Sequence, residues 1–201
     1  MSRLSLAGSC VLLAPACVLL ALAYAPAQAE VFEAEGAKVR VELLPDWPAV
    51  MVGEPLYLSF GIENLGSRNL SYGDGFTRNA LGRPDFLELE VKREDGTVLP
   101  LRDPGPSFGG GFGPHPLAPG ERSVKRLFLP HWATIEEPGT YTLTCRRSLE
   151  LYDEGSDANR PEVARKLDVV ASTTITVDPH DPAKIPAVIA RWEGPLRGPE
   201  T

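Results

Sequence analysis

Cysteine is scarce in this chain of 201 residues, which contains three cysteines in all. Two of them, Cys10 and Cys17, lie in the apolar N-terminal stretch, so Cys145 is the single cysteine of the remainder. A domain with one cysteine forms no internal disulfide, and its fold must be held by packing. A lone cysteine within an alternating β pattern is typical of a small buried hydrophobic residue. We therefore do not interpret Cys145 as a nucleophile.

Long apolar runs are lacking except at the N-terminus, where the first residues read MSRLSLAGSCVLLAPACVLLALAYAPAQAE. One Arg, an apolar run and the small-x-small site Ala27-Gln28-Ala29 are the layout of a secretory signal peptide. We therefore predict that residues 1–29 are removed on export. The alternative is a membrane anchor, but Pro15 interrupts the run, which is short for a span of about 20 residues.

Basic residues are fewer than acidic ones, with 20 Lys and Arg against 27 Asp and Glu. The predicted leader contains one Arg and no acid, so the mature chain carries a net charge of −8. An acidic surface argues against nucleic acid and anionic membranes as partners. We expect a periplasmic or extracellular protein without membrane insertion after leader removal. The expected partner is another envelope or extracellular protein.

A sustained helical period is absent before residue 180, where alternation of apolar and polar residues dominates instead. Two such stretches are PLYLSFGIEN and FLELEVKRE, and a third surrounds Val39, Val41 and Leu43. Further strands are predicted at 123–129, 140–151 and 169–177, whereas 163–170 fits either a helical turn or the start of the last strand. About seven or eight short strands separated by turn signals indicate an all-β sandwich or barrel, and the sandwich is the commoner of the two at this length.

The C-terminal stretch DPHDPAKIPAVIARWEGPLRGPET has a different pattern. Asp181 before Pro182 fits an N-cap with proline at the first helical position. Apolar residues then recur at helical spacing, which predicts a short docked helix over 183–191, followed by a frayed end. The predicted organisation is a signal peptide (1–29), a β-sandwich (30–180) and a C-terminal helix or tail (181–201).

The segment EPGTYTL carries a resemblance to a known family. Glu137, Gly139 and Tyr141 match the acid-x-Gly-x-Tyr-x-Cys pattern at the start of strand F of immunoglobulin domains, with Leu143 in place of the cysteine. The resemblance implies a tyrosine corner, in which the Tyr141 hydroxyl bonds back to upstream backbone. Leucine in the cysteine position agrees with the absence of a disulfide.

The wider layout resembles bacterial exported immunoglobulin-like domains over residues 38–177. The shared signals are VGEPLYLSFGIENLG, REDGTVLPL and LAPGER, all before the EPGTYTL segment. A bacterial proteinase-inhibitor family has the same order of signals. The resemblance implies an immunoglobulin-like Greek-key β-sandwich, but fold similarity alone does not assign a function.

One segment, RDPGPSFGGGFGPHPLAPGER, contains the letters of the G-x-S-x-G motif of serine hydrolases, with Ser107 in the serine position. That motif needs a strand before the serine and a helix after it. Pro104 and Pro106 on one side and GGGFGP on the other exclude both, and the glycines lack the Gly-Lys-Ser/Thr of a phosphate loop. We interpret 103–116 as a long end connection, too rich in Gly and Pro to join a β-ladder. Its Phe108 and Phe112 either plug the core or contact a partner.

Metal ligands are sparse as well. The three histidines are scattered beside prolines or in turns, with no close pair of the kind that zinc sites use. Asp153, Asp157 and Asn159 place oxygens on one loop that could hold Ca²⁺, but their spacing matches no known loop geometry, and a solvated acidic turn is favoured. Glu88 and Glu90 fit a solvated strand face rather than a catalytic pair. We predict no catalytic residue, no metal and no cofactor.

These observations favour an exported, non-enzymatic binding or adaptor β-sandwich that acts in protein–protein interaction at the cell envelope, through end loops or an open sheet edge. One alternative is a proteinase inhibitor, in which an extended loop occupies a protease cleft. The other is a carbohydrate-binding accessory module, for which exposed aromatic residues are few.

Overall fold

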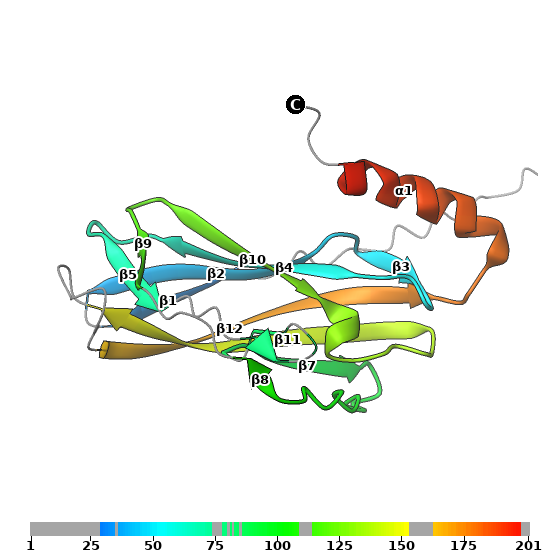
Figure 1. The fold of residues 1–201 in the computed structure, drawn as a ribbon, viewed down its shortest axis with the longest axis horizontal. Helices are drawn as coiled ribbons and strands as arrows, with labels where there is room; N and C mark the ends of the chain where they lie inside the picture. The colour runs from blue at the N-terminus through cyan, green and yellow to red at the C-terminus, as the bar shows by residue number, and fades with distance from the viewer. Residues whose placement is uncertain are drawn as a thin grey trace, which may run out of the picture.

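The computed structural model describes residues 29–34, 36–73, 78–79, 81, 83–84, 86–108, 114–152 and 163–197. The predicted signal peptide, apart from Ala29, lies outside them. Two β-sheets face each other, and one helix follows the last strand at one end of the molecule (Figure 1). No helix among these residues is long and apolar enough to cross a membrane.

The first sheet has four antiparallel strands in the order β1-β2-β4-β10. They are β1 (Glu30–Ala34), β2 (Ala37–Pro45), β4 (Tyr57–Asn64) and β10 (Arg122–Phe128). The alternation predicted from sequence is present: Val39, Val41 and Leu43 are buried while Lys38 and Arg40 are exposed.

The second sheet is built on a long antiparallel pair, β11 (Gly139–Tyr152) and β12 (Val163–Asp178). On one side, β3 (Ala49–Met51) runs parallel to the end of β12. On the other side, β7 (Glu88–Arg93) pairs with the first half of β11, and β5 (Leu70–Gly73) pairs with its end. The short β9 (Pro114–Leu117) pairs with β5. Outside this sheet, β6 (Arg78–Asn79) and β8 (Ser107–Phe108) form a separate two-stranded sheet.

The order of these strands is that of an immunoglobulin-like Greek key. Strands β2, β4 and β10 take the places of A, B and E in one sheet, and β7, β11 and β12 take those of C, F and G in the other. The predicted fold class is thereby confirmed, including the short C-terminal helix. The ambiguous stretch 163–170 is a strand, because Leu167 and Val169 point into the core in alternation with exposed neighbours.

The core lies between the two sheets and is formed by apolar side chains from both. Burying a large apolar side chain stabilises the fold by about 1.5–3 kcal/mol. The largest fully buried side chains include Phe60, Leu43 and Leu58 from the first sheet and Tyr141, Leu143 and Leu149 from the second. Packing of this kind replaces the disulfide that links the sheets in antibody domains.

The C-terminal helix α1 spans Ile185–Arg197 and follows the 3-10 turn η2 (Pro182–Lys184). Asp181 caps the turn as predicted, because its side chain accepts the Ala183 N–H at 3.0 Å. The predicted bounds 183–191 are wrong at both ends. The three residues after Asp181 form the tighter 3-10 turn, and the helix continues six residues past the predicted end.

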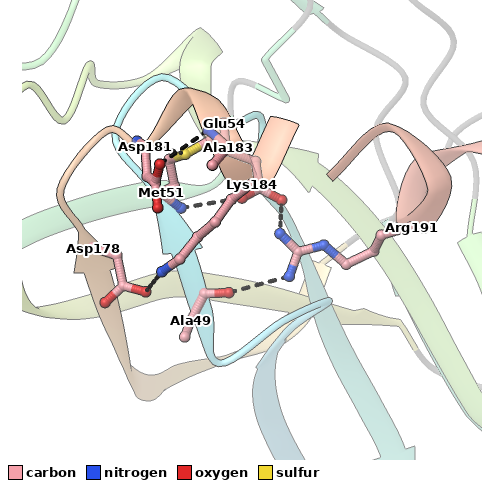
Figure 2. A network of polar contacts seen from close by, with 8 residues as sticks. All are labelled: Ala49, Met51, Glu54, Asp178, Asp181, Ala183, Lys184 and Arg191. Atoms are coloured by element: carbon pink, nitrogen blue, oxygen red, sulfur yellow. Dashed lines mark hydrogen bonds and ion pairs between the residues drawn. The ribbon is translucent and has the colours of Figure 1, made fainter. Parts of the chain in front are cut away.

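Helix α1 is fixed to the sandwich through a polar network (Figure 2). The Glu54 side chain has no exposed surface; it accepts the Met51 N–H at 3.1 Å and pairs with Arg191. Lys184 pairs with Asp178 at 3.5 Å. The Trp192 ring lies edge-on to Trp47, 4.4 Å between centroids, so aromatic packing adds to the charge pairs.

Candidate interaction surface

The tyrosine corner lies at the start of β11. The Tyr141 side chain is buried, and its hydroxyl donates to the Glu137 carbonyl at 2.8 Å, the bond that the sequence pattern predicts. Burial raises the pKa of Tyr141, although the nearby Arg93 guanidinium opposes the shift. Arg93 also pairs with the Glu137 carboxylate, so the corner connects β7 to the start of β11. Its role is structural.

We expect Tyr141→Phe to lower the free energy of unfolding by about 1 to 2 kcal/mol, because the Glu137 carbonyl loses its donor while the ring keeps its packing. Urea unfolding of the two proteins measures the difference. An unchanged unfolding midpoint in Tyr141→Phe would contradict the assignment of β11 as strand F.

Ser107 lies in no catalytic arrangement among the described residues. It is exposed, its backbone pairs with Asn79, and the next described element after β8 is the strand β9. The prediction that 103–116 joins no ladder is wrong, since Ser107–Phe108 and Pro114–Leu117 both pair with other strands. Prolines are tolerated in β9 because it is an edge strand, where a missing N–H is not needed for pairing.

Several predicted residues cannot be placed. The backbone of Phe108 pairs with Arg78, but its side chain lies outside the described part of the chain, as does all of Phe112. Asp153, Asp157 and Asn159 also lie outside it. The partner-contact role of the two phenylalanines and the calcium site therefore stay predictions.

The remaining candidate ligands and acids are dispersed. The rings of His115 and His131 lie against Tyr72 and Phe128, and His180 lies near the Val52 carbonyl. Within the described ranges, no group of three or more His, Cys, Asp or Glu could hold a metal ion. Glu88 and Glu90 lie opposite Arg146 and Thr144 on β11, as cross-strand pairs on a sheet face.

The edge of β7 carries a feature that sequence reasoning missed. The Glu94 N–H donates to Thr140 on β11, so even-numbered positions of this strand face β11 and odd-numbered positions face the outer edge. At that edge Arg93 donates to Thr97, and Leu99 donates to Val91. Pro100 then follows, which lacks an N–H and ends the pairing.

Leu89 is the next position of β7 that faces this edge. No described residue pairs with its N–H or C=O on that side, but the residue as a whole, backbone included, is only 3% exposed. An unpaired strand edge offers backbone donors and acceptors to another chain. Among the described residues, the pairing along the outer edge of β7 therefore ends at Val91, where the segment 97–102 diverges.

A groove of about 410 Å³ lies along this open edge, and we call it the β7-edge groove. Val98 and Leu101 on its rim are 53% and 47% exposed. Trp132 and Arg83 lie deeper; the Arg83 guanidinium donates to the Arg102 carbonyl at 2.6 Å and lies 5.8 Å from the centre of the Trp132 ring. The groove thus combines apolar contacts with an anchored cation, at the place where the edge pairing of β7 ends.

The fold and this groove define the class of molecule, an immunoglobulin-like β-sandwich with a groove at the edge of β7. No protein-family model matches the chain, and no curated protein matches it.

Solved structures with some similarity include the CARDB domain of the PF1109 protein from Pyrococcus furiosus, described in complex with di-metal ions. The match has 15% identity and a TM-score of 0.37, and it covers 74% of this chain and 99% of that one. The sporulation control protein Spo0M from Bacillus subtilis matches with 16% identity and a TM-score of 0.37, over 80% of this chain and 56% of that one. Similarity at this level carries no functional argument, and the fold assignment rests on the strand order itself.

Proposed function

We propose that the protein is an exported, non-enzymatic binding module that takes up an extended segment of a partner protein along the edge of β7. The observation that carries this proposal is the end of the β7 edge pairing at Val91, beside the exposed Val98 and Leu101. Export rests on the predicted signal peptide, and the cell envelope is the proposed place of action.

Strand addition supplies the binding energy in two ways. Backbone hydrogen bonds from a partner strand to the open edge give affinity, and side chains at alternate positions enter pockets beside it and give specificity. In the β7-edge groove, Val98, Leu101 and Trp132 suit apolar side chains at such positions. We propose that the partner segment is extended and carries alternate apolar residues, and that Phe108 and Phe112 contribute further contacts.

The test uses single charge substitutions on the groove rim. The partner is first isolated by chemical crosslinking in the envelope fraction, and its affinity for purified variants is then measured. We expect Val98→Glu and Leu101→Glu each to weaken binding about tenfold or more, since each places a charge in an apolar contact. Hydrogen exchange at the amide of Val98, which is 53% exposed, should slow when the partner is bound.

Two matched controls separate this groove from other exposed apolar positions. Val31, on β1, is 52% exposed, and Val124, on the edge strand β10, is 46% exposed. Val31→Glu and Val124→Glu should leave the affinity unchanged. Loss of binding in Val124→Glu with full binding by Leu101→Glu would move the partner to β10 and overturn the proposed site.

A further inference from the structure

A second hollow lies at the end of the sandwich where β3 passes into β4. It has a volume of about 290 Å³, and we call it the end cleft. Its wall is mostly apolar and comes from both sheets and from the turn η1 (Leu129–His131) with the residues after it, including Val50, Met51, Leu56, Leu129, Ala133 and Ile175. One water molecule takes up roughly 30 Å³, and a non-hydrogen atom of a ligand is of similar size. The end cleft therefore has room for on the order of ten ligand atoms.

The end cleft borders buried core residues directly. Leu56, Ala133 and Ile175 are each at most 2% exposed, yet they line it. An apolar body that replaces water against such a wall gains hydrophobic free energy in proportion to the area covered. The interior of the cleft therefore suits a small aliphatic or similarly apolar group.

Arg102 supplies a positive charge at the rim of this cleft. Its backbone is fixed, because its N–H donates to the Trp132 carbonyl at 2.7 Å and its carbonyl accepts from Arg83. Its guanidinium donates to the Thr134 hydroxyl at 2.8 Å. A guanidinium has five N–H donors in a planar arrangement that matches the two oxygens of a carboxylate. In Arg102 one of these donors is used by the neutral Thr134 hydroxyl.

The acid that lines the same cleft does not compete for this cation. The Glu54 carboxylate is turned toward Arg191 and the Met51 N–H, and its side chain has no exposed surface (Figure 2). Two further acids, Glu136 and Glu137, line a hollow on the outer side of Arg102; Glu137 pairs with Arg93, and no ion pair joins Glu136 to Arg102. Arg102 thus gives the mouth of an apolar cleft a positive charge that an incoming anion can reach.

We propose that the end cleft binds a small amphipathic monocarboxylate, with its apolar body between β3 and η1 and its carboxylate on Arg102 and Thr134. The shape and the charge both contribute to this assignment. An apolar wall without the cation would suit a neutral alcohol equally well, and a cationic ligand would be repelled by Arg102. This site is separate from the β7-edge groove and does not depend on the proposed partner.

Octanoate is a suitable probe, because its ten heavy atoms correspond to roughly the capacity of the cleft. Titration of the purified chain, followed by amide chemical shifts in NMR spectra, should show saturable binding with shifts at Val50, Ala133 and Thr134. We expect octan-1-ol to bind about tenfold more weakly and octylammonium not to bind. Arg102→Gln should reduce the affinity for octanoate about tenfold and leave that for octan-1-ol unchanged.

Matched variants make the outcome decisive. Arg68→Gln changes an exposed arginine at another place in the chain and should leave octanoate binding intact. Val98→Glu, which alters the β7-edge groove, should do the same, so failure of the partner proposal does not affect this one. Octanoate that causes no saturable shift at millimolar concentration, or that binds Arg102→Gln as tightly as the native chain, would overturn the proposal.

Discussion

Asn64→Leu is expected to lower the free energy of unfolding by about 2 to 4 kcal/mol, although Asn64 lines neither proposed site. The Asn64 side chain has no exposed surface; its amide donates to the carbonyls of Arg68 and Leu117 at 2.8 and 2.9 Å and accepts the Gly66 N–H at 2.9 Å. Leucine has a similar volume, but it cannot form hydrogen bonds with these three backbone groups. A buried backbone group that loses its hydrogen-bond partner lowers the free energy of unfolding by about 1 to 3 kcal/mol. Urea unfolding monitored by circular dichroism measures the loss.

Asn64→Leu should lower the free energy of unfolding more than most substitutions of a buried polar residue, because Asn64 connects two turns. Its backbone N–H donates to Glu121 and its carbonyl accepts from Gly120, while its side chain holds the turn after β4. Asn69→Leu is the control, since Asn69 is exposed and lies near the same turn. Surface changes of this kind stay within about 0.5 kcal/mol. Equal losses in the two variants would show that the network contributes nothing specific.

The sequence identifies Asn64 only in part. The letters Asn64-Leu65-Gly66 between two alternating stretches indicate a turn, and the side chain indeed accepts the Gly66 N–H. The bond to Leu117 joins positions 53 residues apart, and no local pattern records such a contact. Local turn chemistry is therefore predictable from the sequence, whereas the connection between two distant turns depends on how the sheets stack.

The same distinction applies to the strands. Long alternating stretches such as Tyr57–Asn64 and Gly139–Tyr152 are predictable because each has one buried and one exposed face. The short β3 and β9 are not, since three or four residues carry too little periodicity and owe their pairing to neighbours far along the chain. For this reason the sequence pattern places most of the proline-containing β9 in the predicted end connection 103–116.

The β7-edge groove cannot be predicted from the sequence, and the physical reason is a different one. Val98 and Leu101 belong to an apolar stretch of the sequence that would be expected in the core, yet both side chains are about half exposed. Their exposure follows from the register of β7 on β11 and from the point at which Pro100 ends the edge pairing. Whether an edge is covered depends on non-local pairing, which no local sequence pattern records.

Cys145→Ala is expected to make the stability less sensitive to alkaline pH. Cys145 lies fully buried on β11 between Ala171 and Leu89, and burial raises the pKa of its thiol to about 12, against the opposing effect of Arg147 and Arg146. An unfolded thiol titrates near 8.5 to 9. Between about pH 9 and 12 the unfolded chain therefore releases a proton that the folded chain retains, and the stability that the neutral thiol gives at lower pH is lost as the pH rises.

Each pH unit in this window costs about 1.4 kcal/mol for one such group, so the native chain should lose about 2 to 3 kcal/mol between about pH 9 and 11 from Cys145 alone. Burial also raises the pKa of Tyr141 and Tyr152, which steepens the alkaline loss in the native chain and in Cys145→Ala alike. The difference between the two proteins in urea unfolding at about pH 8 and about pH 11 isolates the thiol. At the lower pH, Cys145→Ala should be less stable than the native chain because it loses packing. At the higher pH, this difference in the free energy of unfolding should be smaller by about 2 to 3 kcal/mol. A deficit that stays constant over the range would show that the Cys145 thiol titrates alike in the folded and unfolded chain.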